Sequence, residues 1–320
     1  MNDIILITGG LGYVGGRITK YLSDNYNYKL RITTRQTVVQ IPSWLRNGEI
    51  IQVDLMSEES LKSACAGIKH IVHLAALNEI ESSTNPELAL TVNGLGSLKL
   101  LCAAEKAGVE RFIYFSTAHV YGAPLQGTIT EKSLPLPVHP YAITHKTAED
   151  FVLASHDQKV LTGIVLRLSN GFGAPMRPDV DRWTLLVNDL CRQAVTTRKL
   201  VLRSAGFQKR DFITLLDVSR AVSHFLGLPV DQCGNGLFNL GGECSMRIID
   251  MVKLIAKRCY KVLGFKPKII RPAPLPEETP TALDYRIEKL KSTGFILNKN
   301  TNAEIDATLL FCQNEFGQKV

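Results

Sequence analysis

Short apolar runs alternate with helical patterns over the first half of the chain. The runs are rich in β-branched and aromatic residues, which favour strands. These strand-like runs occupy residues 3–8, 29–35, 49–55, 70–76, 111–117 and 162–169. Residues 12–23 and 86–108 have apolar positions at helical spacing, and the longer segment ends at Gly108, a residue type common at helix C-termini. The alternation predicts an α/β fold with a doubly wound parallel sheet.

The regular alternation of strand-like and helical segments ends at Ser169. Loops and helices follow, and strand-like runs return only at 211–218 and 236–242. We expect residues 1–170, with a returning segment at about 211–240, to form the domain that contains the sheet. Residues 171–320 otherwise form a smaller C-terminal lobe, with the active site in the cleft between the two. The proline-rich stretch 266–280 is expected to be an extended loop.

The composition is that of an ordinary globular protein. The chain has 320 residues, of which 45% are hydrophobic and 21% charged, enough to bury a substantial core. No apolar run approaches the roughly 18 residues that span a bilayer, and the first strand begins too early for a signal peptide. Seven cysteines without a CxxC pair or a His/Cys cluster predict free thiols and no metal site. We therefore expect a cytoplasmic protein that has no membrane partner.

The net charge of +7 leaves two interpretations open. Basic residues gather in one stretch, at Arg192, Arg198, Lys199, Arg203, Lys209 and Arg210. The stretch lacks interleaved aromatic residues, and the chain has no nucleic-acid-binding motif, so no nucleic-acid partner is expected. An anionic small molecule and a merely solvated basic face both remain compatible with it.

A glycine-rich turn follows the first strand. In "TGGLGYVGG" the residues Gly9, Gly12 and Gly15 have G-x-x-G-x-x-G spacing between a strand and a helix. Glycine permits the tight turn and lets backbone N–H groups approach a pyrophosphate at the helix N-terminus. A plain structural turn is the alternative, but the strand–loop–helix context favours a dinucleotide site and hence a Rossmann fold.

Several further motifs, in the same order, resemble those of the extended short-chain dehydrogenase/reductase family, in particular its nucleotide-sugar epimerase/dehydratase branch. "TGGLGYVGG", "VDL", "VHLAA" and "VNGLGSLKLL" are similar to the family's cofactor-binding motifs, and the resemblance covers nearly the whole chain. It implies an NAD(P) cofactor, a nucleotide-sugar substrate and a role in nucleotide-sugar metabolism. The implied cofactor contacts are Gly9, Gly12, Tyr13, Val14, Gly15, Asp54, Leu55, Ala75, Ala76 and Asn93.

The active-site motifs resemble the family's as well. "FSTAHVYG" and "PYAITHKTAED" imply Tyr141 as the residue that exchanges a proton with the sugar and Thr117 as the donor to its oxygen, a role that Ser116 could share. Thr117 could instead be a strand-end residue bonded to the backbone. "LRLSNGFGAP" and "QKRDFITLLDV" imply that Asn170 and Arg210 bind the substrate's phosphates. The resemblance also implies a homodimer through the helices near 88–107 and 142–155, although burial against the sheet would explain the apolar faces of these helices too.

The residue four positions after the tyrosine departs from the family. The family has a lysine there, whereas this chain has His145, and Lys146 comes five positions after Tyr141. Residues four apart share a helix face and residues five apart do not, so His145 is the predicted partner of Tyr141. It could orient the tyrosine or bind the nicotinamide ribose. The alternative is a histidine that only packs.

Two further departures concern the cofactor and the reaction. Thr34 and Arg35 stand at the end of the second strand, where NAD-dependent members have an acidic residue. Arginine can bind a 2′-phosphate, so NADP is favoured over NAD, although Arg35 could simply be a solvated charge.

Ala118 and His119 replace the Asp–Glu pair of the family's 4,6-dehydratases, and alanine cannot transfer a proton. Dehydration is therefore not expected.

The nucleotide and the reaction stay open. Where the family has an arginine in an "RPGD"-like loop, this chain has Glu277 and Glu278, so no nucleotide base is predicted. We favour an NAD(P)-dependent 4-ketoreductase, with a 4-epimerase similar to UDP-glucose 4-epimerase as the alternative. A non-catalytic NAD(P)-binding regulator is a third interpretation. The missing lysine favours it, while the intact substrate-side residues favour an enzyme.

Overall fold

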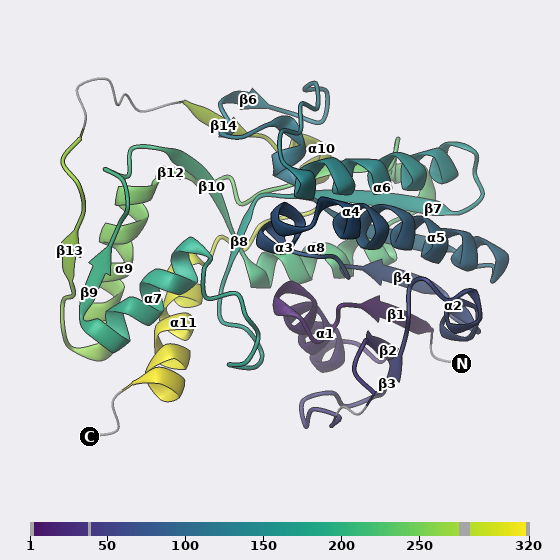
Figure 1. Ribbon diagram of the computed structural model, residues 1–320, viewed down its shortest axis with the longest axis horizontal. Coiled ribbons are helices and arrows are strands. Elements are labelled where there is room, and N and C mark those ends of the chain that lie inside the picture. The colour runs from purple at the N-terminus through teal and green to yellow at the C-terminus, as the bar shows by residue number, and fades with distance from the viewer. Residues whose placement is uncertain (1–2, 38–39, 275–281, 318–320) are drawn as a thin grey trace.

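A parallel sheet of seven strands forms the centre of one half of the protein (Figure 1). The computed structural model describes residues 3–37, 40–274 and 282–317. The strand order is β11-β7-β5-β4-β1-β2-β3, and every neighbouring pair is parallel. The strands are β1 (Ile4–Thr8), β2 (Lys29–Thr34), β3 (Gly48–Gln52), β4 (His70–His73), β5 (Arg111–Thr117), β7 (Thr162–Leu168) and β11 (Leu237–Leu240). The prediction of a doubly wound parallel sheet is confirmed. The order reverses between β1 and β4, which opens a crevice at the carboxyl ends of these strands.

Helices cover both faces of this sheet, which explains why its strands are nearly uniform apolar runs. One face packs against α1 (Tyr13–Asn25) and α8 (Leu215–Gly227), whose inward side chains are buried with those of the strands. The other face packs against α2 (Glu58–Cys65), α5 (Ser97–Lys106) and α6 (Pro140–Asp157). Figure 1 shows these layers, with α5 and α6 along the upper side of the sheet.

The helix predicted at 86–108 is divided into three parts. They are α4 (Pro86–Ala89), a π-helical segment (Leu90–Gly96) and α5, and a short helix α3 (Glu79–Thr84) precedes them. π-Helical turns are rare and often lie at functional sites. The run Pro86–Lys106 is apolar and long enough to cross a membrane by length and composition, contrary to the expectation from the sequence, and 44% of its most apolar window is buried. Its π-helical segment packs against α6 and its end packs against α2.

The second half of the protein is built on three packed helices. They are α7 (Leu186–Thr197), α9 (Ile248–Leu263) and α11 (Thr301–Phe316), which share one hydrophobic core. A three-stranded sheet joins this lobe to the large sheet, and it contains β8 (Asn170–Phe172), β10 (Lys209–Thr214) and β12 (Ser245–Arg247). Figure 1 shows the lobe on the left, with the chain's last helix at its edge.

Smaller elements complete the described chain. Two strand pairs are β9 (Lys199–Val201) with β13 (Lys268–Ile270) and β6 (Gly127–Ile129) with β14 (Leu283–Tyr285). Short helical turns are Ala118–Tyr121, Val230–Gln232 and α10 (Glu288–Ser292).

The returning segment expected at 211–240 is divided between the two halves. Helix α8 and β11 return to the large sheet, whereas β10 pairs with β8 and β12 in the small one. The extended loop expected at 266–280 contains β13, and its last residues, 275–280 with Glu277 and Glu278, lie outside the described residues.

Candidate functional site

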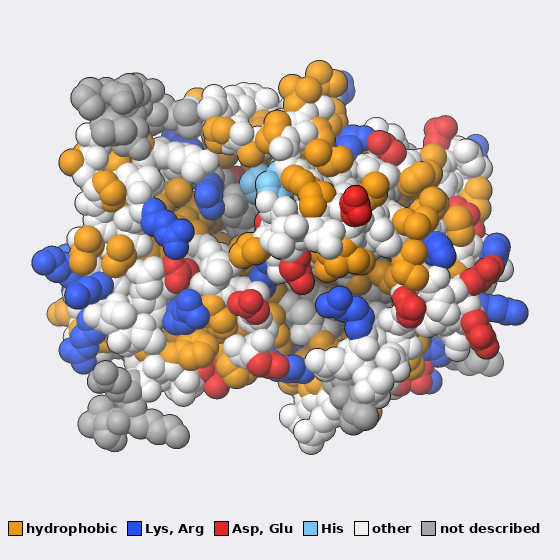
Figure 2. Space-filling view, in the orientation of Figure 1, with side chains coloured by type: hydrophobic (Ala, Val, Ile, Leu, Met, Phe, Trp, Pro, Cys, Tyr) orange, Lys and Arg blue, Asp and Glu red, His pale blue; other side chains and the backbone are white. Residues whose placement is uncertain are grey.

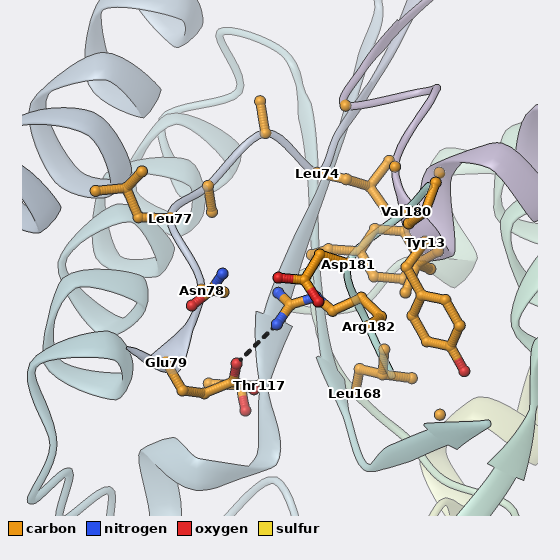
Figure 3. A pocket seen from close by; sticks show the side chains of 18 of the residues that line it. Tyr13, Leu74, Leu77, Asn78, Glu79, Thr117, Leu168, Val180, Asp181 and Arg182 are labelled. Atoms are coloured by element: carbon orange, nitrogen blue, oxygen red, sulfur yellow. Dashed lines mark hydrogen bonds and ion pairs between the residues drawn. The ribbon is translucent and has the colours of Figure 1, made fainter. Parts of the chain in front are cut away.

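A cavity of about 730 Å³ lies at the carboxyl ends of the large sheet's strands, where the lobe faces them. Figure 3 shows part of its wall, with side chains that come from both halves of the protein. Most residues singled out from the sequence line it: Gly9, Gly12, Tyr13, Val14, Gly15, Arg35, Asp54, Leu55, Ala75, Ala76, Ser116, Thr117, Tyr141, His145, Asn170 and Arg210. The cofactor, catalytic and substrate candidates therefore share one cavity.

The glycine-rich turn forms one end of this cavity. Gly9 has φ +68°, a conformation that favours glycine, and a Cβ added to Gly15 would lie 2.2 Å from the Gly9 carbonyl oxygen. The turn leads directly into α1, whose first turn contains no acidic side chain. Such a helix start attracts a phosphate through its free N–H groups and its dipole. The turn therefore fits the pyrophosphate of a dinucleotide.

Residues beyond β2 and β3 line the part of the cavity next to this turn. Arg35 and Asp54 are both exposed there, and the carboxylate of Asp54 accepts a hydrogen bond from the N–H of Met56. Ala75 closes the side beside β4, and its N–H donates to the Thr8 hydroxyl at 3.1 Å. Small and polar groups thus surround a channel that suits the adenosine of a nicotinamide cofactor.

Asn93 lies behind the cavity wall and does not line it. Its side chain is fully buried in the π-helical segment, where Oδ1 accepts a hydrogen bond from the N–H of Leu77 at 2.7 Å. Its Nδ2 donates to the Thr144 hydroxyl at 3.1 Å. In this structure Asn93 fixes the backbone after β4 to helix α6, so direct contact with a cofactor stays a prediction.

The serine and threonine at the end of β5 have different surroundings. The Thr117 hydroxyl accepts a hydrogen bond from the N–H of His119, which leaves its proton available to a ligand. The Ser116 hydroxyl donates to the carboxylate of Glu149 at 2.5 Å, and that carboxylate also binds the guanidinium of Arg167 at 2.7 and 3.0 Å. Ser116 is therefore engaged by a buried ion pair, and Thr117 is the better placed of the two to meet a substrate.

Tyr141 and His145 are neighbours on α6, as their spacing predicts. Their ring centroids are 4.4 Å apart in an edge-to-face arrangement. His145 is buried, with Nδ1 2.8 Å from the Tyr114 hydroxyl, and its Nε2 has no hydrogen-bond partner among the described residues. Lys146 lies on the other face of the helix, where it forms an ion pair with Asp150. The residue on the tyrosine's face is thus the histidine.

Burial determines the charge at this position. It lowers the pKa of His145 to about 4, an effect that the carboxylate of Glu79 partly opposes, so the imidazole is neutral at pH 7. Burial also raises the pKa of Tyr141 above its usual value of 10, and Glu79 adds to the effect while Arg182 opposes it. Tyr141 therefore holds its proton at neutral pH.

The substrate-side candidates lie on the two adjacent small strands. Asn170 begins β8 and donates through Nδ2 to the carbonyl oxygen of Asp211 at 2.9 Å. Arg210 lies beside it on β10, half-buried in the cavity wall, and burial lowers the pKa of its guanidinium. A half-buried guanidinium beside an amide is a suitable anion site.

Four residues of the site were not singled out from the sequence. Tyr114 holds His145, Glu149 holds Ser116, and Glu79 with Arg182 forms an ion pair in the cavity. Tyr114 lies in a plain apolar run and Glu149 on a helix where charges are common, so neither carries a sequence signal. The pairing of Glu79 with Arg182 joins residues 103 positions apart, which only the folded chain brings together.

The sequences of curated relatives align with most of this chain. It is similar to human dTDP-D-glucose 4,6-dehydratase, with 28% identity over 261 residues that cover 78% of this chain and 72% of the relative. It is also similar to UDP-glucose 4-epimerase of Rhizobium meliloti (strain 1021), with 25% identity over 281 residues that cover 82% of this chain and 84% of the relative.

Solved structures share its fold. UDP-N-acetylglucosamine 4-epimerase from Methanobrevibacter ruminantium M1 superposes with a TM-score of 0.79 at 24% identity, over 97% of this chain and 98% of that one. Thermus thermophilus UDP-glucose 4-epimerase, solved in complex with NAD, has a TM-score of 0.80 at 22% identity, over 98% and 99%. The family model described as "NAD dependent epimerase/dehydratase family" matches residues 5–241, most of the chain. The protein therefore belongs to the NAD-dependent epimerase/dehydratase family.

Proposed function

We propose that the protein is a nucleotide-sugar 4-ketoreductase in which Tyr141 donates the proton. The neutral state of His145 carries this proposal. A tyrosine that must begin by removing a proton is helped by a cation beside it, which stabilises the phenolate. Burial keeps His145 uncharged and Tyr141 protonated at pH 7. A protonated tyrosine is ready to give its proton to a carbonyl oxygen, as ketone reduction requires.

The remaining residues have supporting roles in this reaction. A reduced nicotinamide supplies the hydride to the carbonyl carbon when it is bound. Thr117 donates a hydrogen bond to the substrate oxygen, and Tyr141 delivers the proton that completes the alcohol. Asn170 and Arg210 bind the diphosphate of the nucleotide sugar. His145 positions the tyrosine ring through its edge-to-face contact.

NADP is the preferred cofactor in this proposal. Arg35 is exposed at the end of β2 and lines the cavity, where NAD-dependent members have an acidic residue. A guanidinium can bind the 2′-phosphate through charge-assisted hydrogen bonds, whereas a carboxylate would repel it. NAD stays the alternative, because structural neighbours such as the Thermus thermophilus epimerase were solved with it.

A nucleotide-sugar 4-epimerase is the second candidate. The similarity to UDP-glucose 4-epimerase of Rhizobium meliloti favours it. An epimerase first oxidises the sugar, so Tyr141 would have to give up its proton before it receives the next one. The oxidised nicotinamide's positive charge would then be the main stabilisation of the phenolate. This requirement makes epimerisation the less favoured candidate.

A panel of nucleotide sugars tests the proposal. The protein is mixed with NADPH or NADH and dTDP-4-keto-6-deoxyglucose, and with UDP-glucose, UDP-galactose and GDP-mannose, while nicotinamide absorbance and sugar products are followed. Oxidation of NADPH by the keto sugar supports the ketoreductase. Interconversion of UDP-glucose and UDP-galactose without net cofactor change supports the epimerase. Cofactor binding without turnover of any sugar identifies a non-catalytic regulator and contradicts both.

We further propose a cytoplasmic homodimer. Figure 2 shows hydrophobic side chains gathered over the region of α4, α5 and α6. Three side chains of the π-helical segment and α6 are well exposed: Leu90, Ile143 and Phe151, at 51%, 46% and 41%. A second copy of the chain would bury these side chains. Sedimentation analysis of the purified protein tests this arrangement.

A further inference from the structure

An ion pair crosses the cavity between the two halves of the protein. Glu79 is the first residue of α3, beside the large sheet, and Arg182 lies in the loop that leads to α7 in the lobe. Glu79 Oε2 and Arg182 Nη1 are 3.1 Å apart (Figure 3). Both side chains are partly exposed, at 42% and 26%, and a single contact joins them. A bond of this kind is weak enough for a ligand to replace.

Glu79 lies next to the proposed reaction centre. Its side chain lines the same cavity as Thr117 and Tyr141, and Figure 3 shows it reaching across to Arg182. Its negative charge raises the pKa of Tyr141 and opposes the lowering of the pKa of His119 by burial. A sugar held at Thr117 and Tyr141 would therefore lie within reach of the negative charge of Glu79.

Every described arginine of the cavity wall already has a partner or a proposed role. Arg35 lies at the adenosine end, Arg177 pairs with Asp179, and Arg182 pairs with Glu79. Arg210 is taken by the diphosphate in the proposed function. The described part of the cavity wall contains no lysine. A substrate carboxylate near Glu79 would find no cation there that is free to neutralise it.

We propose that Glu79 is a specificity-determining residue that selects neutral nucleotide sugars and rejects nucleotide-linked uronates. The inference rests on the proposed action on nucleotide sugars. A sugar hydroxyl can donate to the Glu79 carboxylate and accept from Arg182, so it fits between the two. A uronate places a second negative charge beside Glu79 in a cavity that screens charge less than bulk water. Arg182 supplies one positive charge against two carboxylates, so it cannot neutralise Glu79 and the uronate together.

Paired ligands that differ only at carbon 6 test the proposal. Isothermal titration of the NADP-bound protein compares UDP-glucose with UDP-glucuronate, and dTDP-glucose with dTDP-glucuronate. The wild type is expected to bind the neutral sugar at least about tenfold more tightly. Glu79→Gln is expected to reduce the ratio of the two affinities, neutral sugar over uronate, by about tenfold, because it removes the charge and frees Arg182. Glu87→Gln, which removes an exposed acidic charge on α4 outside the cavity, is the matched control and should keep the wild-type ratio of the two affinities.

A third variant separates charge from structure. Arg182→Met leaves Glu79 uncompensated, so the ratio should rise while the melting temperature stays close to that of the wild type. A wild type that binds both sugars of a pair equally, or a Glu79→Gln variant with an unchanged ratio, overturns the role of Glu79 and leaves the proposed function standing. Failure of every neutral and acidic nucleotide sugar to bind contradicts the proposed function itself.

Discussion

The hydroxyl of Tyr114 lies 2.8 Å from Nδ1 of His145, whose ring in turn contacts the ring of Tyr141, the proposed proton donor. This hydrogen bond orients the imidazole without giving it a charge, because burial lowers the pKa of His145 to about 4. Tyr141 thus has an aromatic neighbour with fixed orientation, 4.4 Å away between centroids. A lysine at the same place would bring a cation. The difference bears directly on the direction in which the site works best.

Replacing His145 by lysine should therefore favour oxidation. A buried ammonium beside Tyr141 lowers the pKa of the phenol and makes proton removal easier. We expect His145→Lys to keep ketone reduction and to raise the rate of alcohol oxidation at neutral pH by about tenfold, which corresponds to a shift of about one pKa unit. Rates in both directions, measured with the keto sugar and its alcohol, check this expectation. Unchanged rates in both directions would show that His145 is not the tyrosine's partner.

Two variants on the same helix serve as controls. Tyr141→Phe removes the donor proton and should reduce turnover by about 10² to 10⁴, the usual contribution of a general acid. Lys146→Ala changes a basic residue whose ion pair with Asp150 lies on the other face of the helix, and it should leave turnover as in the wild type. A strong effect of Lys146→Ala would mean that the geometry of α6 differs during turnover.

The fold was predictable because its strands are buried on both faces. Runs such as Arg111–Thr117 are continuous, apolar and bounded by helical segments, so their extent follows from the pattern alone. The division of residues 86–108 into α4, a π-helical segment and α5 had no such signal, because seven π-helical residues are too few to change the apolar pattern of the whole run. The pairing of β10 with β8 depends on contacts between distant segments, which local pattern does not encode.

The candidate site was predictable only where a motif marks it. Gly9 and Tyr141 lie in motifs, and both line the cavity. Asn93 lies in a motif too, yet its amide binds the backbone of Leu77 behind the wall. Glu79 reaches Arg182 only because the two halves of the protein meet across the cavity, and neither residue has a local signature. Spacing predicted the proximity of Tyr141 and His145, whereas the neutral state of the imidazole follows from burial.

Cofactor preference should depend on Arg35. We expect NADPH to bind about tenfold or more tightly than NADH, since a charge-assisted hydrogen bond to a phosphate contributes roughly 1.5–3 kcal/mol. Arg35→Asp should reverse the preference, because a carboxylate can accept from the ribose hydroxyls and repels the 2′-phosphate. Isothermal titration with both cofactors measures this. Equal affinities in the wild type that stay equal in Arg35→Asp would contradict the assignment of NADP.

No dehydration of nucleotide sugars is expected, despite the similarity to human dTDP-D-glucose 4,6-dehydratase. Removal of water needs an acid that protonates the leaving hydroxyl. Ala118 cannot donate a proton, and His119, although exposed, has its pKa lowered by partial desolvation, so the imidazole is a poor proton donor at pH 7. Incubation with dTDP-glucose and NAD, followed by mass spectrometry, should show no 4-keto-6-deoxy product. Loss of water at an enzymatic rate would return dehydration to the candidates.

Stability should fall in mild acid because of buried histidines. The pKa of His145 is about 4 in the folded protein against 6.5 for the free side chain, so the unfolded chain binds more protons between these values. The free energy of unfolding therefore decreases as the pH falls from about 6.5 to about 4. His70, with a pKa lowered to about 4, adds to the same trend. Urea titrations at several pH values in this range measure the free energy of unfolding. This free energy should decrease less with falling pH for His145→Gln than for the wild type or Lys146→Ala.

The buried ion pair between Glu149 and Arg167 should behave as one unit. Its two hydrogen bonds, at 2.7 and 3.0 Å, join α6 to β7, and Ser116 donates to the same carboxylate at the end of β5. Glu149→Gln leaves the guanidinium buried without a counter-charge, so the free energy of unfolding should fall by about 3–5 kcal/mol. The double variant Glu149→Gln, Arg167→Met removes both charges and should recover much of that loss, whereas Lys106→Ala, which breaks an exposed pair, should change little. If the double variant is as unstable as the sum of the two single variants, the pair does not act as a unit, and its carboxylate stabilises the protein chiefly through Ser116.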